Sequence, residues 1–92
     1  MDITVIHDIE NERFVADING DKAYAVYNLQ GDIINLNSTF TPPHLRGRGI
    51  AKTIMETVFK YARENNLKVH PICSYVKTFV SRNQEYADIV TN

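Results

Sequence analysis

The chain has 92 residues, a length that fits one compact domain spanning residues 1–92 and leaves no room for a second hydrophobic core. Its apolar and charged fractions, 43% and 23%, are ordinary for a soluble globular protein. The net charge of −1 argues against a protein that binds nucleic acid or an anionic membrane over its whole surface, so any anion site must be local.

The first half of the chain predicts antiparallel strands. Alternating side chains indicate a short strand at residues 3–7 and a second strand at residues 13–18. The second strand ends at Asn19-Gly20, a dipeptide typical of a type I′ hairpin turn, because both central residues of that turn need a positive φ. A third strand is predicted at residues 23–28.

A short turn leads to a fourth strand, residues 33–41. We expect Ile34, Leu36 and Phe40 to share one face of this strand, since alternate residues of a strand point the same way. Two consecutive prolines end it, because proline has no N–H group to donate to a neighbouring strand.

From Ile50 onward the apolar residues recur at helical spacing. Charged residues of alternating sign recur every four positions on the other side, as on a helix face exposed to solvent. Asn65-Asn66 suits the end of this helix, where asparagine tolerates left-handed backbone geometry.

A short strand at residues 67–72 and a short helix capped by Ser74 are predicted next. Residues from Asn83 onward are equally consistent with a helical turn and with an extended tail. Because a helix joins the strand at residues 33–41 to the strand at 67–72, we expect these two strands to be parallel neighbours. The fold class is therefore a mixed sheet with helices, α/β or α+β.

The single cysteine, Cys73, excludes an internal disulfide framework and a metal cage built from cysteines, and we expect no metal site. No apolar stretch approaches the roughly 18–20 residues that cross a bilayer, and the N-terminus lacks a secretory signal pattern. We therefore expect a cytoplasmic protein that has no membrane partner.

Residues 46–51, with the sequence RGRGIA, lie between the fourth strand and the long helix. The first turn of a helix has unpaired N–H groups and the positive end of the helix dipole. Glycines let these donors approach a phosphate, and the two arginines and Lys52 add positive charge. The glycines alone are also consistent with a tight strand-to-helix connection and no ligand.

Two better-known phosphate loops do not fit this segment. The Lys-Ser/Thr ending of a Walker loop is absent, since Gly49 is followed by Ile50 and Ala51. The dinucleotide fingerprint needs a third glycine and an acidic residue after the next strand, and neither is present.

The segment resembles the Arg/Gln-x-x-Gly-x-Gly/Ala signature of the GNAT acetyltransferase superfamily, with Arg46, Gly49 and Ala51 at the defining positions. Residues 40–45 and the downstream Pro-Ile-Cys-Ser-Tyr at 71–75 resemble a subfamily of very small GNAT-like proteins, in which such a cysteine motif follows the fifth strand. The resemblance covers nearly the whole chain. It implies a minimal GNAT-like acyltransferase fold.

The resemblance also implies a cofactor, acetyl-coenzyme A, held in a V-shaped gap between two parallel strands. The strand before the loop would pair with the pantetheine arm, and the loop and helix start would bind the pyrophosphate. The implied cofactor-binding residues are Thr39, Phe40, Thr41, Arg46, Gly47, Arg48, Gly49, Ile50, Ala51 and Lys52.

Three residues are candidates for the chemistry of acetyl transfer. His44 is either the base that deprotonates the acceptor amine or a solvated loop histidine. Cys73 either lies at the thioester, where it accepts the acetyl group or positions the thiol, or is a small buried residue. Tyr75 is either the acid for the thiolate or a core aromatic, and for His70 we expect a packing or capping role.

A full-length GNAT domain has one or two helices between its first two strands, where this chain has only a short turn at residues 9–13. The acceptor side is therefore expected to be open. Two functions fit: an N-acetyltransferase acting on an unidentified amine or protein acceptor, and a non-catalytic acyl-coenzyme A sensor that meets a partner protein. A nucleic-acid binder fits less well, because the rest of the chain is not basic.

Overall fold

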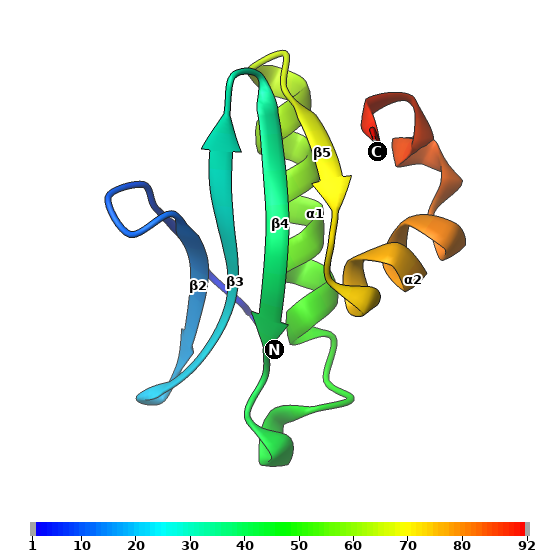
Figure 1. Ribbon diagram of the computed structural model, residues 1–92. Coiled ribbons are helices and arrows are strands. Elements are labelled where there is room, and N and C mark those ends of the chain that lie inside the picture. The colour runs from blue at the N-terminus through cyan, green and yellow to red at the C-terminus, as the bar shows by residue number, and fades with distance from the viewer. Residues whose placement is uncertain (1, 92) are drawn as a thin grey trace.

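The computed structural model describes residues 2–91, so the ends of the expected domain, residues 1 and 92, lie outside the described residues. Across this range one sheet has the strand order β1-β2-β3-β4-β5 (Figure 1). The elements are β1 Val5–Asp8, β2 Arg13–Ile18, β3 Asp21–Gln30, β4 Ile33–Phe40, η1 Pro43–Leu45, α1 Ile50–Glu64, β5 Lys68–Pro71, α2 Ser74–Arg82 and η2 Gln84–Ile89. Within residues 2–91, none of the helices is long and apolar enough to cross a membrane.

The first four strands form an antiparallel meander, and β5 runs parallel to β4. Both features confirm the predicted mixed α+β sheet, since α1 is the crossover between the two parallel strands. The β2–β3 hairpin turns at Asn19 and Gly20, whose φ angles of 55° and 92° fit the predicted type I′ turn. The first strand covers Val5–Asp8 instead of residues 3–7.

The predicted face of β4 is wrong beyond Leu36, because the strand contains a bulge. Leu36 pairs with Tyr27 of β3, but the next paired residue is Ser38, so Asn37 has no β3 partner. This extra residue reverses the alternation of side chains. Phe40 therefore lies on the outer face and is 40% exposed, although the sequence pattern placed it with the core residues of the strand.

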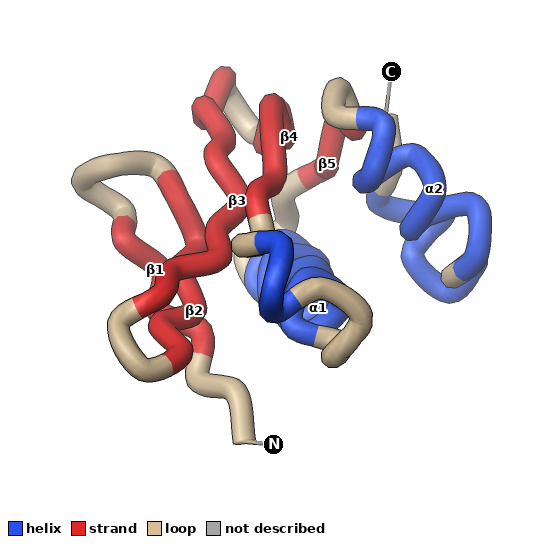
Figure 2. The backbone as a smooth tube through the Cα atoms, turned by 90° about the horizontal axis from the view of Figure 1, so that it is seen from below, coloured by secondary structure: helices blue, strands red, loops and turns tan. Residues whose placement is uncertain are grey.

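Helix α1 covers one face of the sheet (Figure 2). Its buried residues are Ile50, Ile54, Met55, Val58, Phe59 and Ala62. They join one core with inward-facing strand residues, among them Phe14, Ala16, Ala23, Ala25, Tyr27, Ile34 and Leu36. No helix of residues 2–91 covers the opposite face in the views of Figures 1 and 2, and α2 lies beyond the β5 edge.

The predicted cap of the second helix is wrong by one residue. Cys73 is the N-cap, and Ser74 is already the first helical residue. Helix α2 is held beside α1 by three aromatic rings: Phe59, Phe79 and Tyr86 lie with centroids 4.8–5.7 Å apart. Packing of these rings positions α2 against α1, and Cys73 is the N-cap of that helix.

The residues after α2, which the sequence left open, form the short η2 helix and then return to the sheet. Val90 makes a parallel bridge with Val69 of β5. Arg63 of α1 donates to both carboxylate oxygens of Asp88, at 2.8 and 3.0 Å. The C-terminal segment therefore covers the outer edge of β5.

His7 of β1 is half-buried at the far end of the core from α2. Its ring stacks on Phe14 with centroids 3.9 Å apart, and its Nε2 lies 2.6 Å from the hydroxyl of Tyr27. Burial lowers the pKa of His7 below its ordinary value of 6.5, and the neighbouring Asp8 carboxylate offsets only part of this effect.

We expect the free energy of unfolding to decrease as the pH falls below about 6.5. The unfolded chain takes up a proton on His7 at the ordinary pKa, whereas the folded state resists it. The stabilising contribution is therefore present above the unfolded pKa and lost as the pH falls through the lower, folded pKa. Urea denaturation at about pH 7.5 and pH 5 measures the loss. His7→Phe keeps an aromatic ring beside Phe14 and cannot titrate, so an unchanged pH dependence in this variant would contradict the assignment.

Candidate functional site

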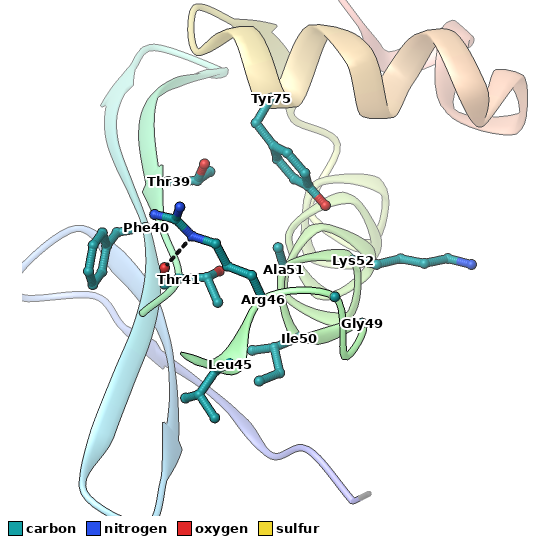
Figure 3. Close-up of a pocket in the computed structure, with 11 residues that line it drawn as sticks. Thr39, Phe40, Thr41, Leu45, Arg46, Gly49, Ile50, Ala51, Lys52 and Tyr75 are labelled. Atoms are coloured by element: carbon teal, nitrogen blue, oxygen red, sulfur yellow. Dashed lines mark hydrogen bonds between the residues drawn. The ribbon is translucent and has the colours of Figure 1, made fainter. Parts of the chain in front are cut away.

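A cleft of about 440 Å³ lies at the end of β4, between that strand, the start of α1 and the first turn of α2 (Figure 3). Tyr75 points into it from α2, across from Thr39 and Arg46 (Figure 3). Its lining residues are Thr39, Phe40, Thr41, Leu45, Arg46, Gly47, Gly49, Ile50, Ala51, Lys52 and Tyr75. The fold thus brings most of the predicted site residues to one hollow. Leu45, which the sequence pattern did not single out, is buried beneath the loop.

The loop before α1 needs its glycines for backbone conformation. Gly47 and Gly49 have φ angles of 81° and 80°, a left-handed conformation that costs an L-residue about 1–2 kcal/mol. A Cβ on either glycine would meet no atom within 4 Å, so the space beside the backbone is open. The loop therefore presents bare backbone to the cleft.

The start of α1 offers hydrogen-bond donors that no protein group caps. Gly49 is the N-cap, no side chain bonds the first turn, and the first turn contains no acidic residue. The unpaired N–H groups and the helix dipole favour an anion at this place. Lys52 and Arg46, which line the same cleft, add positive charge.

The cleft also exposes the edge of β4 where that strand separates from β5. The register between the strands ends at Leu36 and Pro71, and the N–H groups of Ile72 and Cys73 both donate to the carbonyl of Leu36 at 3.2 Å. Beyond Leu36, β4 pairs with β3 along its other edge. The edge at residues 37–41 is therefore available to an extended ligand, apart from the carbonyl of Thr41, which accepts a 3.0 Å bond from Nε of Arg46 (Figure 3).

Cys73 lies where β4 and β5 separate, next to a side chain from the bulged strand. The bulge turns Thr39 inward, and its hydroxyl lies 3.6 Å from the sulfur of Cys73. Burial by itself raises the pKa of the Cys73 thiol. Hydrogen bonds from the Thr39 hydroxyl and from the backbone N–H groups of Tyr75 and Val76 outweigh burial, so the pKa is lower than that of a free cysteine.

Three predicted residues, Cys73, His44 and Arg48, do not line the cleft. His44 is exposed on the loop, and its Nε2 lies 2.9 Å from a carboxylate oxygen of Asp21 on the β2–β3 hairpin. Arg48 is exposed at the tip of the glycine loop. The structure therefore gathers the predicted cofactor residues other than Arg48 with Tyr75, places Cys73 beside them, and directs His44 toward Asp21.

A second hollow of about 340 Å³ adjoins the cleft, since Lys52 and Tyr75 line both. Its other lining residues are Thr78, Phe79, Arg82 and Asn83. The sequence pattern did not indicate Arg82, because only the packing of α2 against α1 brings it to the same hollow as Lys52. The two hollows together can hold a ligand longer than the cleft alone.

We expect the Cys73 thiol of the wild type to react with iodoacetamide faster at neutral pH than a free cysteine, because its lowered pKa gives more thiolate. Thr39→Val removes one donor to the sulfur and should move the midpoint of the rate–pH curve upward. Thr41→Val, which alters a threonine with no bond to the sulfur, is the matched control. Equal midpoints for Thr39→Val and wild type would contradict the role of the Thr39 hydroxyl.

The chain is similar to proteins of one known family. A family model described as GCN5-related N-acetyl-transferase matches residues 13–89. Protein NATD1 of Gallus gallus is 36% identical over 84 residues, which cover 88% of this chain and 76% of NATD1; for Homo sapiens NATD1 the identity is 36% and the shares are 88% and 74%. The solution structure of a GCN5-like candidate N-acetyltransferase from Staphylococcus aureus superimposes with a TM-score of 0.76 at 26% identity, covering 99% of this chain and 88% of that chain.

Proposed function

Because the chain belongs to the GCN5-related N-acetyltransferase family, we propose that its cleft binds acetyl-coenzyme A and that the protein transfers the acetyl group to an amine. The observation that carries the proposal is the convergence of an uncapped helix start, two left-handed glycines and an unpaired strand edge on one hollow. We assign this activity to one cytoplasmic domain, residues 1–92.

In this proposal the pyrophosphate lies at the glycine loop. The N–H groups at residues 49–52 donate to it, and Arg46, Arg48 and Lys52 neutralise its charge. The pantetheine arm runs along the open edge of β4, where its amides pair with backbone groups of residues 39–41. Arg46 releases the carbonyl of Thr41 when the arm binds. The adenosine portion occupies the second hollow beside Arg82.

The chemistry is acyl transfer from a thioester to a nitrogen. The amine nitrogen attacks the carbonyl carbon, a C–N bond forms, and the C–S bond breaks as coenzyme A leaves as a thiolate. A base takes the proton of the amine, and the hydroxyl of Tyr75 supplies one to the thiolate. Burial raises the pKa of Tyr75, which keeps this hydroxyl protonated at neutral pH.

Cys73 has two possible roles in this scheme. In the first, its thiolate attacks the thioester, releases coenzyme A and passes the acetyl group on to the amine. In the second, it only positions the thioester. His44 does not line the cleft, and its Nε2 is paired with Asp21 on the β2–β3 hairpin, so the geometry supports it least among the proposed catalytic residues.

The second candidate function is a non-catalytic acyl-coenzyme A sensor. The uncovered face of the sheet favours it, because that face is free to meet a partner protein. Incubation with acetyl-coenzyme A labelled in the acetyl group separates the two functions. Label on Cys73 or on an added amine supports transfer, whereas tight binding with no loss of thioester for any amine supports the sensor.

Binding itself is tested by thermal denaturation with acetyl-coenzyme A, coenzyme A and adenosine diphosphate. A ligand at about 100 times its Kd stabilises the native state by about 2.7 kcal/mol. For a chain of this size that corresponds to a rise in Tm of roughly 10–20 °C. We expect a shift with both coenzyme A forms. No shift at millimolar coenzyme A would overturn the proposed function.

A further inference from the structure

Three hydrogen-bonded side chains lie on the sheet face opposite α1. Asn35 of β4 is only 8% exposed, and it pairs in register with His70 of β5. Its Nδ2 donates to Oε1 of Gln30 at 3.2 Å, and its Oδ1 lies 3.1 Å from Nδ1 of His70. Ile34, Leu36 and Val69, the sequence neighbours of Asn35 and His70, are buried in the core. Because successive residues of a strand point to opposite faces, the three hydrogen-bonded side chains lie on the outer face.

With the amides of Asn35 and Gln30 oriented in this way, the contacts favour one tautomer of the neutral His70 ring. The amide nitrogen of Asn35 donates to Gln30, so the amide oxygen of Asn35 faces the imidazole of His70. An amide oxygen only accepts hydrogen bonds, so the neutral ring carries its hydrogen on Nδ1. Nε2 then has a free lone pair, and it is the atom of His70 that can accept a proton.

The position of His70 suits an amine that approaches the thioester. The Asn35–His70 pair lies one register step before Leu36–Pro71, the last pair of β4 and β5. One step along a strand is about 3.3 Å, so His70 lies close to the rim of the gap in which we propose the thioester. Helix α1 covers the other face (Figure 2), so an acceptor that reaches the gap arrives on the face that carries His70.

We infer that Nε2 of His70, rather than His44, accepts the proton that the acceptor amine loses, directly or through one water. The inference rests on the proposed acetyl transfer. The amine nitrogen bonds to the acetyl carbon, its proton passes to Nε2, and coenzyme A leaves as a thiolate that is protonated by Tyr75. Asn35 holds the imidazolium in place through Nδ1–H, in the way that a third group orients a catalytic base.

The first test measures thiol release from acetyl-coenzyme A with a lysine-containing peptide as the acceptor. His70→Gln keeps an N–H group for Asn35 but has no basic nitrogen, so we expect kcat to fall about 100- to 10,000-fold while KM for acetyl-coenzyme A stays unchanged. The decrease in kcat should be smaller for His44→Gln than for His70→Gln. Added imidazole should restore part of the rate of His70→Ala, a result that a purely structural role would not give. Wild-type kcat in His70→Gln overturns the inference.

The second test does not need turnover. The ¹⁵N shifts of the histidine rings report which nitrogen carries the hydrogen, and His70→Gln identifies the signal. The Nδ1–H tautomer supports the inference, and the Nε2–H tautomer overturns it, even if the peptide is not acetylated by the wild type. If acetyl-coenzyme A gives no thermal shift, the proposed function fails and this inference fails with it. If the wild type binds acetyl-coenzyme A and transfers the acetyl group, the rates of the His70 variants and the ring tautomer decide the inference.

Discussion

If the protein binds acetyl-coenzyme A as proposed, the variant Gly49→Val should no longer show the rise in Tm that this ligand gives to the wild type. Gly49 is the N-cap of α1 with a φ of 80°, and its backbone borders the cleft. A branched side chain at this place disfavours the left-handed conformation and fills the space where the pyrophosphate is proposed to lie. We expect the ligand-induced shift to vanish and the free energy of unfolding to fall by about 1–2 kcal/mol.

The matched control for this prediction is Gly31→Val. Gly31 also has a positive φ, 62°, and a Cβ there would also meet no atom within 4 Å. It lies before the start of β4, whereas the cleft is at the end of that strand. Gly31→Val should therefore lose a similar amount of stability and keep the full shift. A normal shift in Gly49→Val would show that the loop is not the phosphate site.

Phe59→Ala should cost about 3–5 kcal/mol of unfolding free energy, the range for removal of a buried aromatic side chain. Phe59 is fully buried, and its ring lies 5.7 Å from that of Phe79 and 4.8 Å from that of Tyr86. Domains of this size are stable by only about 5–15 kcal/mol, so the variant should be close to unfolding. Urea denaturation followed by circular dichroism measures the loss.

Phe40→Ala is the control for the aromatic cluster. Phe40 lies on the outer face of the sheet, where its ring is 5.4 Å from that of Tyr24. We expect its removal to cost only about 1 kcal/mol, the value of an exposed aromatic pair. A similar loss in both variants would mean that the packing of α2 and η2 on α1 contributes little. A loss confined to Phe59→Ala would show that this packing stabilises the segment that carries Cys73.

The sequence alone determined the features that depend on neighbouring residues. The Asn19-Gly20 turn, the helix that begins at Ile50 and the parallel crossover follow from local backbone preferences and hydrophobic periodicity, and the structure has all three. The glycine loop could also be predicted, because glycines before an amphipathic helix act within one short segment. The family of the protein was predicted from the same residues, and the matching family model confirms it.

Tertiary structure alone decided how the strands bring distant side chains together. The bulge at Asn37 could not be predicted, because it depends on how β4 pairs with β3, and it alone turns Thr39 toward Cys73. For the same reason the sequence did not indicate that Asn35 orients His70, 35 positions away. Local patterns determine each element of this protein, but the contacts between elements determine which side chains its chemistry can use, since those contacts form only when the sheet is assembled.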